Sequence, residues 1–319
     1  MEGGKMEIKV IRDKGEMRKW SRSMRLRGNT IAFVPTMGYL HEGHLSLIKE
    51  AKTRAQVVVV SIYVNPGQFS PNEDFSTYPT DFQGDLSKLG SLSGSVDVVF
   101  SPSNLYDYGD TVANNEDCQK SGNKNTISCV ESNDIQNRHE SWVRVERLEK
   151  GLCGKSRPVF FRGVATIVTK LFNIVEPDIA VCGKKDYQQF KIIQRMVRDL
   201  EFPIQIVGSE ISREHDGLAM SSRNVRLSPD GRQKAISISK TLLRAKLLAE
   251  NGERNSHNLE EMAKEAIEKD GGSVDYAQIV DQETLEPVDK ICGPVVFCIA
   301  AWFDLVRLID NMEINVTDG

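Results

Sequence analysis

Short apolar runs rich in valine and isoleucine alternate with longer amphipathic segments along the first two thirds of the chain. Several of these runs are apolar at every position, which is typical of strands that are buried on both faces of a parallel sheet. We therefore predict strands at Ile31–Val34, Val57–Val64, Val96–Phe100, Ile179–Cys182 and Ile204–Val207.

The segments between these runs have the spacing of helices. In one of them Phe190, Ile193 and Val197 recur at helical intervals, so that one face is apolar. The predicted helices are Leu45–Ala55, Asp81–Leu92, Val164–Val175 and Asp186–Leu200. Strands that alternate with helices in this way indicate an α/β fold with a doubly wound, Rossmann-like parallel sheet. Ligands of such a sheet lie at the carboxyl ends of its strands.

Two stretches depart from this pattern. Residues 109–139 are rich in Asn, Ser, Asp, Glu and Lys and poor in large apolar residues, so we interpret them as a mobile surface insertion. After residue 208 the chain shows two helical stretches and then three strand-like runs, at Pro229–Glu250, Leu259–Lys269, Val274–Val280, Pro294–Ala301 and Leu305–Ile309. We expect an N-terminal domain, residues 1–208, and a smaller α+β lid domain, residues 209–319.

Composition narrows the class of protein. The 319 residues carry a net charge of −4, which does not favour a broad basic surface for nucleic acid. No stretch reaches the ~20 apolar residues that span a bilayer, and residues 1–9 lack the apolar core of a secretion signal. The six cysteines show neither a Cys-x-x-Cys pair nor histidines at zinc spacing. These features predict a cytoplasmic protein with reduced cysteines and with no membrane or nucleic-acid partner.

A run with two glycines and two histidines, Pro35–His44, directly follows the first predicted strand. Gly38 and Gly43 suit a backbone that turns sharply or approaches a ligand closely. His41 and His44 lie one turn apart at the start of the next helix, whose N-terminus attracts phosphate. Their imidazoles can donate hydrogen bonds to the charge that develops when a triphosphate is split. A pair of capping or surface histidines is the alternative interpretation.

Three further polar motifs follow strands or lie between the predicted domains. Tyr63–Phe69 contains an Asn-Pro-Gly turn and Gln68, whose amide can fix a hydroxyl and a carboxylate of a small polar acid. Gly183–Gln189 places cations and a helix N-terminus on the same rim of the sheet. Met220–Arg223 combines two hydroxyls with an arginine, which suits a lid over the β- and γ-phosphates. The alternatives are a simple turn, a solvated lysine pair and a polar linker.

The spacing of His41 and His44 resembles the His-x-Gly-His signature of the nucleotidylyltransferase superfamily, and the longer run resembles the pantothenate synthetase family. The match extends from Phe33 to about Leu227 apart from the insertion, and it is weaker in the C-terminal part. The resemblance implies that pantoate is bound by Thr36, Met37, Gln68 and Gln189. It implies that ATP is bound by Met37, Gly38, His41, His44, Gly183, Lys185, Asp186, Met220, Ser221, Ser222 and Arg223, with His41, His44 and Lys185 as catalytic residues.

The chain departs from the family pattern in three places. Phe160 stands where family members often carry a histidine, so the gate that the resemblance implies is assigned to Ser156 and Arg157 without a histidine contact. Gly84 stands where an acidic residue is common, which leaves Asp85, and beside it Asp81, as candidate metal ligands or partners of the water shell of a metal. The insertion is also longer than in the bacterial pattern.

The resemblance implies an ATP-dependent ligase. It would condense pantoate with β-alanine to pantothenate through a pantoyl adenylate, releasing AMP and pyrophosphate, with Mg²⁺ carried by ATP and no tightly bound organic cofactor. A homodimer is the expected assembly. Two alternatives stay open. An NMN-type adenylyltransferase fits the paired glutamines and the Ser-Ser-Arg lid poorly, and a non-catalytic nucleotide-binding regulator would not need His41, His44, Lys185 and Arg223 together.

Overall fold

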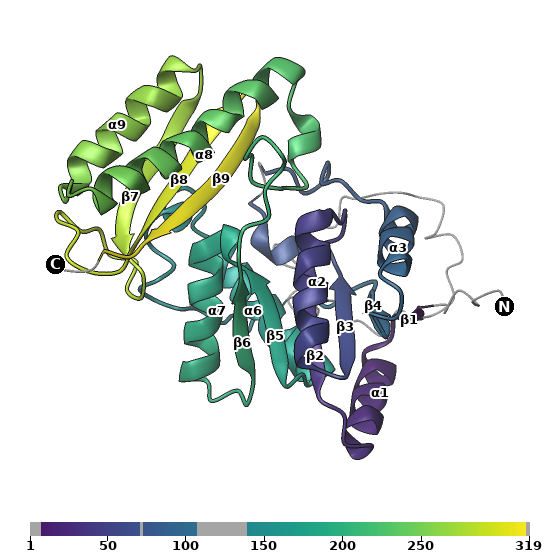
Figure 1. The fold of residues 1–319 in the computed structure, drawn as a ribbon. Helices are drawn as coiled ribbons and strands as arrows, with labels where there is room; N and C mark the ends of the chain where they lie inside the picture. The colour runs from purple at the N-terminus through teal and green to yellow at the C-terminus, as the bar shows by residue number, and fades with distance from the viewer. Residues whose placement is uncertain (1–7, 71–72, 107–138, 317–319) are drawn as a thin grey trace.

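A parallel sheet forms the larger part of the protein (Figure 1). The computed structural model describes residues 8–70, 73–106 and 139–316. In this part of the chain the sheet has six strands, in the spatial order β1-β4-β3-β2-β5-β6, and all of their pairings are parallel. The strands are β1 (Lys9–Ile11), β2 (Ile31–Thr36), β3 (Val57–Ile62), β4 (Val98–Phe100), β5 (Ile179–Gly183) and β6 (Gln205–Ser209). The strand order reverses between β2 and β5, which confirms the doubly wound fold.

Helices cover both faces of this sheet. They are α1 (Lys14–Leu26), α2 (Glu42–Arg54), α3 (Phe82–Ser91), α6 (Phe160–Val175) and α7 (Tyr187–Asp199). Ile31 and Phe33 of β2 share a core with α1, α6 and α7, whereas Ala32 and Val34 share the opposite core with α2 and α3. Since successive side chains point to opposite faces, a strand covered on both sides must be apolar throughout.

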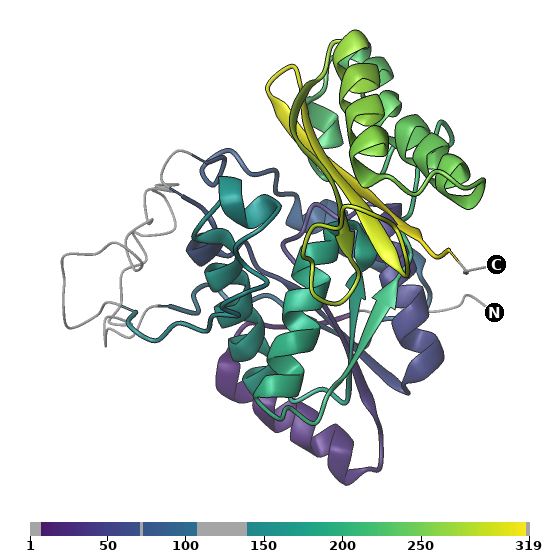
Figure 2. The ribbon, with the colours of Figure 1, turned by 90° about the vertical axis from the view of Figure 1, so that its left-hand side faces the viewer.

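A second, antiparallel sheet follows in the sequence. It has the order β7-β8-β9 in the described residues. Its elements are α8 (Pro229–Glu250), α9 (Ser256–Lys269), β7 (Ser273–Asp281), β8 (Val295–Phe303) and β9 (Val306–Ile314). Phe297 and Ile299 pack with α8 and α9 in a separate core, whereas Val296 and Cys298 face Tyr187 and the larger domain. Figures 1 and 2 show this sheet beyond the carboxyl ends of the parallel strands.

Strand β9 runs past its predicted end at Ile309. The next two residues, Asp310 and Asn311, are polar and yet only 4% exposed, so the apolar pattern stops before the strand does. Arg213 donates to both Asp310 oxygens at 2.6 and 3.0 Å. The Asn311 amide donates at 2.9 Å to the main-chain carbonyl of Lys184. Polar partners that lie far away in the sequence therefore explain the missed end.

The sequence pattern did not reveal β1 or α1. Strand β1 has only three residues, and α1 buries only Met17 and Ser21, so its apolar stripe is narrow. The start of α1 nevertheless carries a capping signal, because Asp13 Oδ1 accepts the N–H of Glu16 at 2.7 Å.

Two sequence-based expectations concern the limits of the domains. The predicted insertion, 109–139, lies outside the described residues except for His139. The change from one sheet to the other comes after β6, and the boundary between residues 208 and 209 stays a prediction. Among the described helices, none is long and apolar enough to cross a membrane.

Candidate active site

Side chains from the ends of β2, β3 and β5 and from the loop after β6 surround a cavity of about 230 Å³, which we call the strand-end cavity. The predicted site residues that line it are Thr36, Met37, His41, His44, Gln68, Gly183, Lys185, Asp186, Gln189, Met220, Ser221, Ser222 and Arg223. The other candidates lie outside it. Gly38 is in the turn after β2, Asp85 is on α3, and Ser156 and Arg157 line a neighbouring cavity.

Helix α3 fixes the turn that leads from β2 into α2. Gly38 and Tyr39 adopt φ angles of 84° and 52°, in the left-handed region. Asp85 accepts the N–H groups of Tyr39 and Leu40 at 2.8 and 2.6 Å, and Lys88 Nζ donates to the Leu40 carbonyl at 2.6 Å. A Cβ at Gly38 would lie 3.0 Å from Asp85 Oδ2, so both the angle and the space require glycine.

The two histidines cap α2. His41 is its N-cap and accepts the N–H of Gly43 on Nδ1 at 3.1 Å, while His44 Nδ1 accepts the N–H of His41 at 3.4 Å. The ring centroids are 4.1 Å apart. An Nδ1 that accepts a hydrogen bond carries no proton, so each neutral ring offers Nε2–H as a donor. The N–H groups expected to be free at this helix end are therefore partly used by the rings.

Burial and neighbouring cations keep both rings neutral. Burial, together with the charges of Lys185 and Lys88, lowers the pKa of His41 to about 4. Burial, followed by His41 and the same two lysines, lowers the pKa of His44 to about 3. At neutral pH these rings are uncharged donors, and the positive charge at the cavity comes from residues such as Lys185 and Arg223.

We expect the protein to lose stability as the pH falls from about 6.5 to about 4. An unfolded histidine has a pKa of about 6.5, so in this window the unfolded chain binds protons that the folded chain does not. The free energy of unfolding should fall by up to about 1.4 kcal/mol per pH unit for each histidine, and the stabilisation is fully present above pH ~6.5. Urea unfolding at several pH values gives the free energy of unfolding, which should fall less steeply with decreasing pH for His44→Gln than for the wild type. An equal dependence on pH would contradict a neutral His44 in the folded protein.

Gln68 is held by an asparagine at the start of its turn. It ends the short helix η1 (Pro66–Gln68), and Asn65 Nδ2 donates at 2.9 Å to Gln68 Oε1 and at 3.2 Å to the carbonyl of Gly163 on α6. Asn65 Oδ1 in turn accepts the Tyr106 hydroxyl at 2.8 Å. Because the oxygen of the Gln68 amide is engaged, its NH₂ group is the part available to a ligand.

Of two adjacent lysines, Lys185 lines the strand-end cavity and Lys184 does not. Lys184 Nζ lies 2.6 Å from Glu210 Oε1 and 2.8 Å from Glu313 Oε2, so its charge is used within the protein. The ion pair of Lys185 with Asp186 is long, at 3.9 Å. Lys185 is therefore the lysine placed to meet an anion.

The two adjacent glutamines, Gln188 and Gln189, also differ in what they contact. Gln188 Nε2 donates at 2.8 Å to the carbonyls of Leu148 and Gly151, which ties this preceding loop to α7. Gln189 lines the strand-end cavity, as Gln68 does. The structure thus brings the two predicted pantoate contacts, Gln68 and Gln189, to one cavity from different strand ends.

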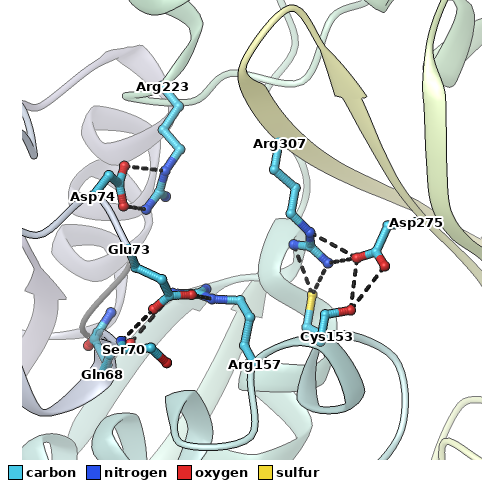
Figure 3. Close-up of polar contacts among 10 residues, drawn as sticks. Gln68, Ser70, Glu73, Asp74, Cys153, Arg157, Arg223, Asp275 and Arg307 are labelled. Atoms are coloured by element: carbon cyan, nitrogen blue, oxygen red, sulfur yellow. Dashed lines mark hydrogen bonds and ion pairs between the residues drawn. The ribbon is translucent and has the colours of Figure 1, made fainter.

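Arg223, the arginine of the predicted lid, is paired with a carboxylate. Arg223 Nε and Nη2 donate to the two oxygens of Asp74 at 3.1 and 3.0 Å, and Arg226 Nη1 donates to the same group at 2.7 Å (Figure 3 shows the first pair). Burial alone would raise the pKa of Asp74, but hydrogen bonds from the two arginines outweigh it and hold this pKa below its ordinary value. Ser222 Oγ donates to the Tyr39 carbonyl at 3.3 Å, which joins the lid to the histidine turn.

The carboxylates expected near a metal face the backbone. Asp81 Oδ1 accepts the N–H of Gly84 at 2.9 Å as the N-cap of α3, and a Cβ at Gly84 would lie 2.1 Å from Asp81 Oδ2. Asp85 holds the turn after β2 with both oxygens. Across the described ranges, no group of three or more His, Cys, Asp and Glu side chains could hold a metal ion. In this structure both oxygens of Asp85 are therefore used by the turn, and its role as a metal ligand stays a prediction.

A second cavity of about 480 Å³ lies between the two sheets, and we call it the inter-sheet cavity. The predicted gate residues line it. Ser156, at the end of the short helix α5 (Cys153–Ser156), donates to Asp275 at 2.9 Å, and Arg157 Nε lies 2.5 Å from Glu73 Oε1 (Figure 3). The residues that line both cavities are Lys185, Asp186, Gln189, Ser221 and Arg223. The two cavities therefore adjoin along one rim.

Some residues of these cavities were not predicted as site residues. One wall of the strand-end cavity is apolar and belongs to α6, with Val164, Ile167, Val168 and Leu171. Their spacing predicts an apolar helix face but does not say whether protein or ligand covers it. Glu73 and Asp74 had no signal at all, because nothing in their local sequence shows that arginines from distant segments meet them.

A doubly wound sheet whose strand ends bring two neutral histidines, Lys185 and Arg223 to one cavity defines an α/β enzyme that binds a nucleotide. Comparison with known proteins makes this class specific. The sequence model of the family described as "Pantoate-beta-alanine ligase" matches residues 9–313. The chain therefore belongs to the pantoate–β-alanine ligase family, whose members are ligases that form pantothenate. The alternative of an NMN-type adenylyltransferase has no support in these comparisons.

Relatives of known name are similar in sequence to this chain over nearly its whole length. The pantoate–β-alanine ligase of Lotus japonicus is 64% identical over 311 residues, which is 96% of this chain and 99% of the relative. That of Arabidopsis thaliana is 64% identical, over 98% of this chain and 100% of the relative. Among solved structures, pantothenate synthetase from Thermus thermophilus has a TM-score of 0.81 and 36% identity, covering 97% of this chain and 100% of its own.

A further structural relative was solved with ligands. The pantoate–β-alanine ligase of Francisella tularensis, described as complexed with "Beta-gamma ATP" and β-alanine, has a TM-score of 0.71 and 31% identity. The match covers 96% of this chain and 97% of that one.

Proposed function

We propose that the enzyme binds pantoate and ATP side by side in the strand-end cavity and joins them as pantoyl adenylate before β-alanine reacts. One observation carries the proposal, and it is the combination of groups that line this cavity. Gln68 is tied through Asn65 to α6, whose apolar side chains form one wall. Gln189 lines the same cavity, and the histidines, Lys185 and Arg223 supply donors and charge to it. A hydroxy acid with an apolar centre fits the first set of groups, and a triphosphate fits the second.

On the pantoate side, Gln68 and Gln189 would bind the hydroxyls and the carboxylate. The NH₂ group of Gln68 is oriented by Asn65, whose own amide is fixed to the backbone of α6. The two methyl groups of pantoate would pack on the apolar α6 wall, with Thr36 and Met37 closing the cavity at the end of β2. Binding without a cation leaves the pantoate carboxylate nucleophilic.

On the ATP side, His41, His44 and Lys185 would stabilise the reacting phosphates. A carboxylate oxygen of pantoate attacks the α-phosphorus, the bond from this phosphorus to the bridging oxygen breaks, and pyrophosphate leaves with the electron pair. The two Nε2–H donors need no proton transfer at neutral pH, so they are preorganised for the charge that develops. Gly183, Asp186 and Met220 would position the nucleoside, and Ser221, Ser222 and Arg223 would hold the outgoing phosphates. Gly38 would contribute through the turn that it shapes.

In the second step the ammonium group of β-alanine loses one proton to solvent, and the resulting amine attacks the acyl carbon. The carbon–oxygen bond to AMP breaks, AMP leaves with the electron pair, a second N–H proton passes to solvent, and the amide of pantothenate forms. Magnesium would arrive bound to the triphosphate. The gate residues Ser156 and Arg157 lie on the side of the inter-sheet cavity, where the amine would enter.

Pyrophosphate exchange tests the order of the steps. With pantoate and ATP alone, the enzyme should exchange labelled pyrophosphate into ATP, because the adenylate forms without the amine. Gln68→Ala should lower this exchange by raising the KM for pantoate about 10-fold, as expected for one lost hydrogen-bonding group, and should leave ATP affinity nearly unchanged.

The same assay can overturn the proposal. Exchange that begins only after β-alanine is added, under conditions where pyrophosphate release is not limiting, would exclude the two-step route. An equal loss of ATP affinity in Gln68→Ala would show that this glutamine binds the nucleotide. Gln188→Ala is the matched control, because this neighbouring glutamine is bonded to main-chain carbonyls and should leave the KM for pantoate unchanged.

Assembly and location belong to the proposal as well. We expect a homodimer in the cytoplasm, with ATP, pantoate and β-alanine as its small-molecule partners. Light scattering on the purified protein measures the first of these expectations, and a fluorescent fusion of the full chain measures the second.

A further inference from the structure

The inter-sheet cavity offers a site for the second substrate. It shares Gln189 and Lys185 with the strand-end cavity, so a molecule bound in it can reach a group that is bound beside the strand ends. β-Alanine is a short zwitterion whose amine must face the acyl carbon. Its carboxylate then lies at the other end of the molecule, away from the strand-end cavity. A cation on the far wall of the inter-sheet cavity is needed to bind it.

Four arginines of the described chain line this cavity, and three of them have well-matched acceptors. Arg223 and Arg226 share Asp74, and Arg157 donates from Nε and Nη2 to the two oxygens of Glu73 (Figure 3). The fourth, Arg307 on β9, belongs to the three-stranded sheet and faces the cavity from the opposite side.

The guanidinium of Arg307 is only partly satisfied. Its Nε and Nη2 both donate to a single oxygen of Asp275, at 3.0 and 2.7 Å. The remaining contacts of Nη1 and Nη2 are with Cys153 Sγ, at 3.6 and 3.5 Å. A thiol sulfur is a weak acceptor, and the Arg307 side chain is only 14% exposed. Within the described residues, Nη1 thus meets sulfur where an oxygen anion would bind more strongly.

The surroundings of Arg307 fix its orientation. Asp275 accepts the Ser156 hydroxyl as well as Arg307, so its position is fixed from two sides. Asp275 engages Nε and Nη2 of Arg307, which leaves Nη1 with Cys153 Sγ as its acceptor. A carboxylate can therefore bind at Nη1 while Asp275 keeps the guanidinium in place.

We propose that Arg307, held in place by Asp275, binds the carboxylate of β-alanine and directs its amine past Gln189 towards the strand-end cavity. This inference rests on the proposed function, because it assumes that an acyl adenylate forms there. The carboxylate replaces Cys153 Sγ as the acceptor for Nη1.

Steady-state kinetics of Arg307→Gln test the assignment. The KM for β-alanine should rise about 10- to 100-fold, the loss expected when a charge-assisted hydrogen bond to the ligand is removed. Pantoate-dependent pyrophosphate exchange should stay near the wild-type rate, since it precedes amine binding. Arg307→Lys keeps the charge and should restore part of the affinity. Arg232→Gln, which removes a comparable pair with Asp216 outside both cavities, should leave the KM for β-alanine unchanged.

A second substrate separates direct contact from a structural effect. β-Alaninamide carries the same amine but no carboxylate, so the wild type should use it far less efficiently than β-alanine. Arg307→Gln should use the two with similar kcat/KM, because the group that distinguishes them is gone. An undiminished preference for β-alanine, an unchanged KM, or loss of exchange in both Arg307 variants would overturn the proposal. Absence of exchange in the wild type would instead refute the adenylate mechanism.

Discussion

Replacing Lys185 or His44 by alanine should lower kcat by roughly 10²–10³, the scale for removing one preorganised donor from developing charge. His44 is a partly buried, neutral donor, and Lys185 is the lysine at the strand-end cavity whose ion pair is long. Both should act on the transition state of adenylate formation, so pyrophosphate exchange should fall in parallel with kcat. The KM for β-alanine should change little.

The neighbouring lysine provides the matched control. Lys184→Ala removes an adjacent cation that is already paired with Glu210 and Glu313, so it should cost about 1 kcal/mol of stability at most and leave kcat close to that of the wild type. Circular dichroism establishes whether each variant is folded. A folded Lys185→Ala enzyme with normal kcat would remove Lys185 from the catalytic residues.

Gly163→Ala should disrupt the pantoate side of the cavity by a steric route. A Cβ at this position of α6 would lie 2.0 Å from the carbonyl oxygen of Gly67 and 2.6 Å from Cα of Gln68. Backbone atoms cannot move aside as a side chain can, so the free energy of unfolding should fall by about 2 kcal/mol or more. In the protein that still folds, displacement of Gln68 should raise the KM for pantoate about 10-fold. Thermal unfolding and steady-state kinetics measure the two effects.

Gly90 on α3 serves as the control for this change. A Cβ there has no atom within 4 Å, so Gly90→Ala should leave the KM for pantoate unchanged and raise stability by up to about 1 kcal/mol. A Gly163→Ala protein as stable as Gly90→Ala would show that α6 and η1 are not packed as closely as the structure has them.

The fold could be predicted from the sequence wherever the pattern of apolar positions matches the positions that are buried. The apolar strands β2, β3 and β5 and the helix α8 were found because each residue's environment follows from its place in a regular element. Prediction was wrong at the end of β9, where Asp310 and Asn311 are buried through partners that no local pattern contains. It also missed α1, whose buried face is narrow.

The candidate site was also predictable in part. Motifs at strand ends located the histidines, both glutamines and Lys185, because parallel strands end on one rim. Their partners were not predictable, since Asp74, Glu73 and Arg307 acquire their significance only when separate segments meet. Asp85 was placed in the right region, but its carboxylate faces the turn of the backbone.

The carboxylate shared by Arg223 and Arg226 has a consequence for selectivity between nucleotides. In the structure both arginines pair with Asp74, and all three side chains are largely shielded from water. On the proposed function, a nucleotide engages the arginines by anion exchange, and the guanidinium of Arg223 passes from one anion to another without first being solvated. A single carboxylate is a modest competitor, which the outer phosphates of ATP displace by their greater charge. AMP, which has no outer phosphates, would leave the ion pairs with Asp74 intact, so the site should discriminate between ATP and AMP at these arginines.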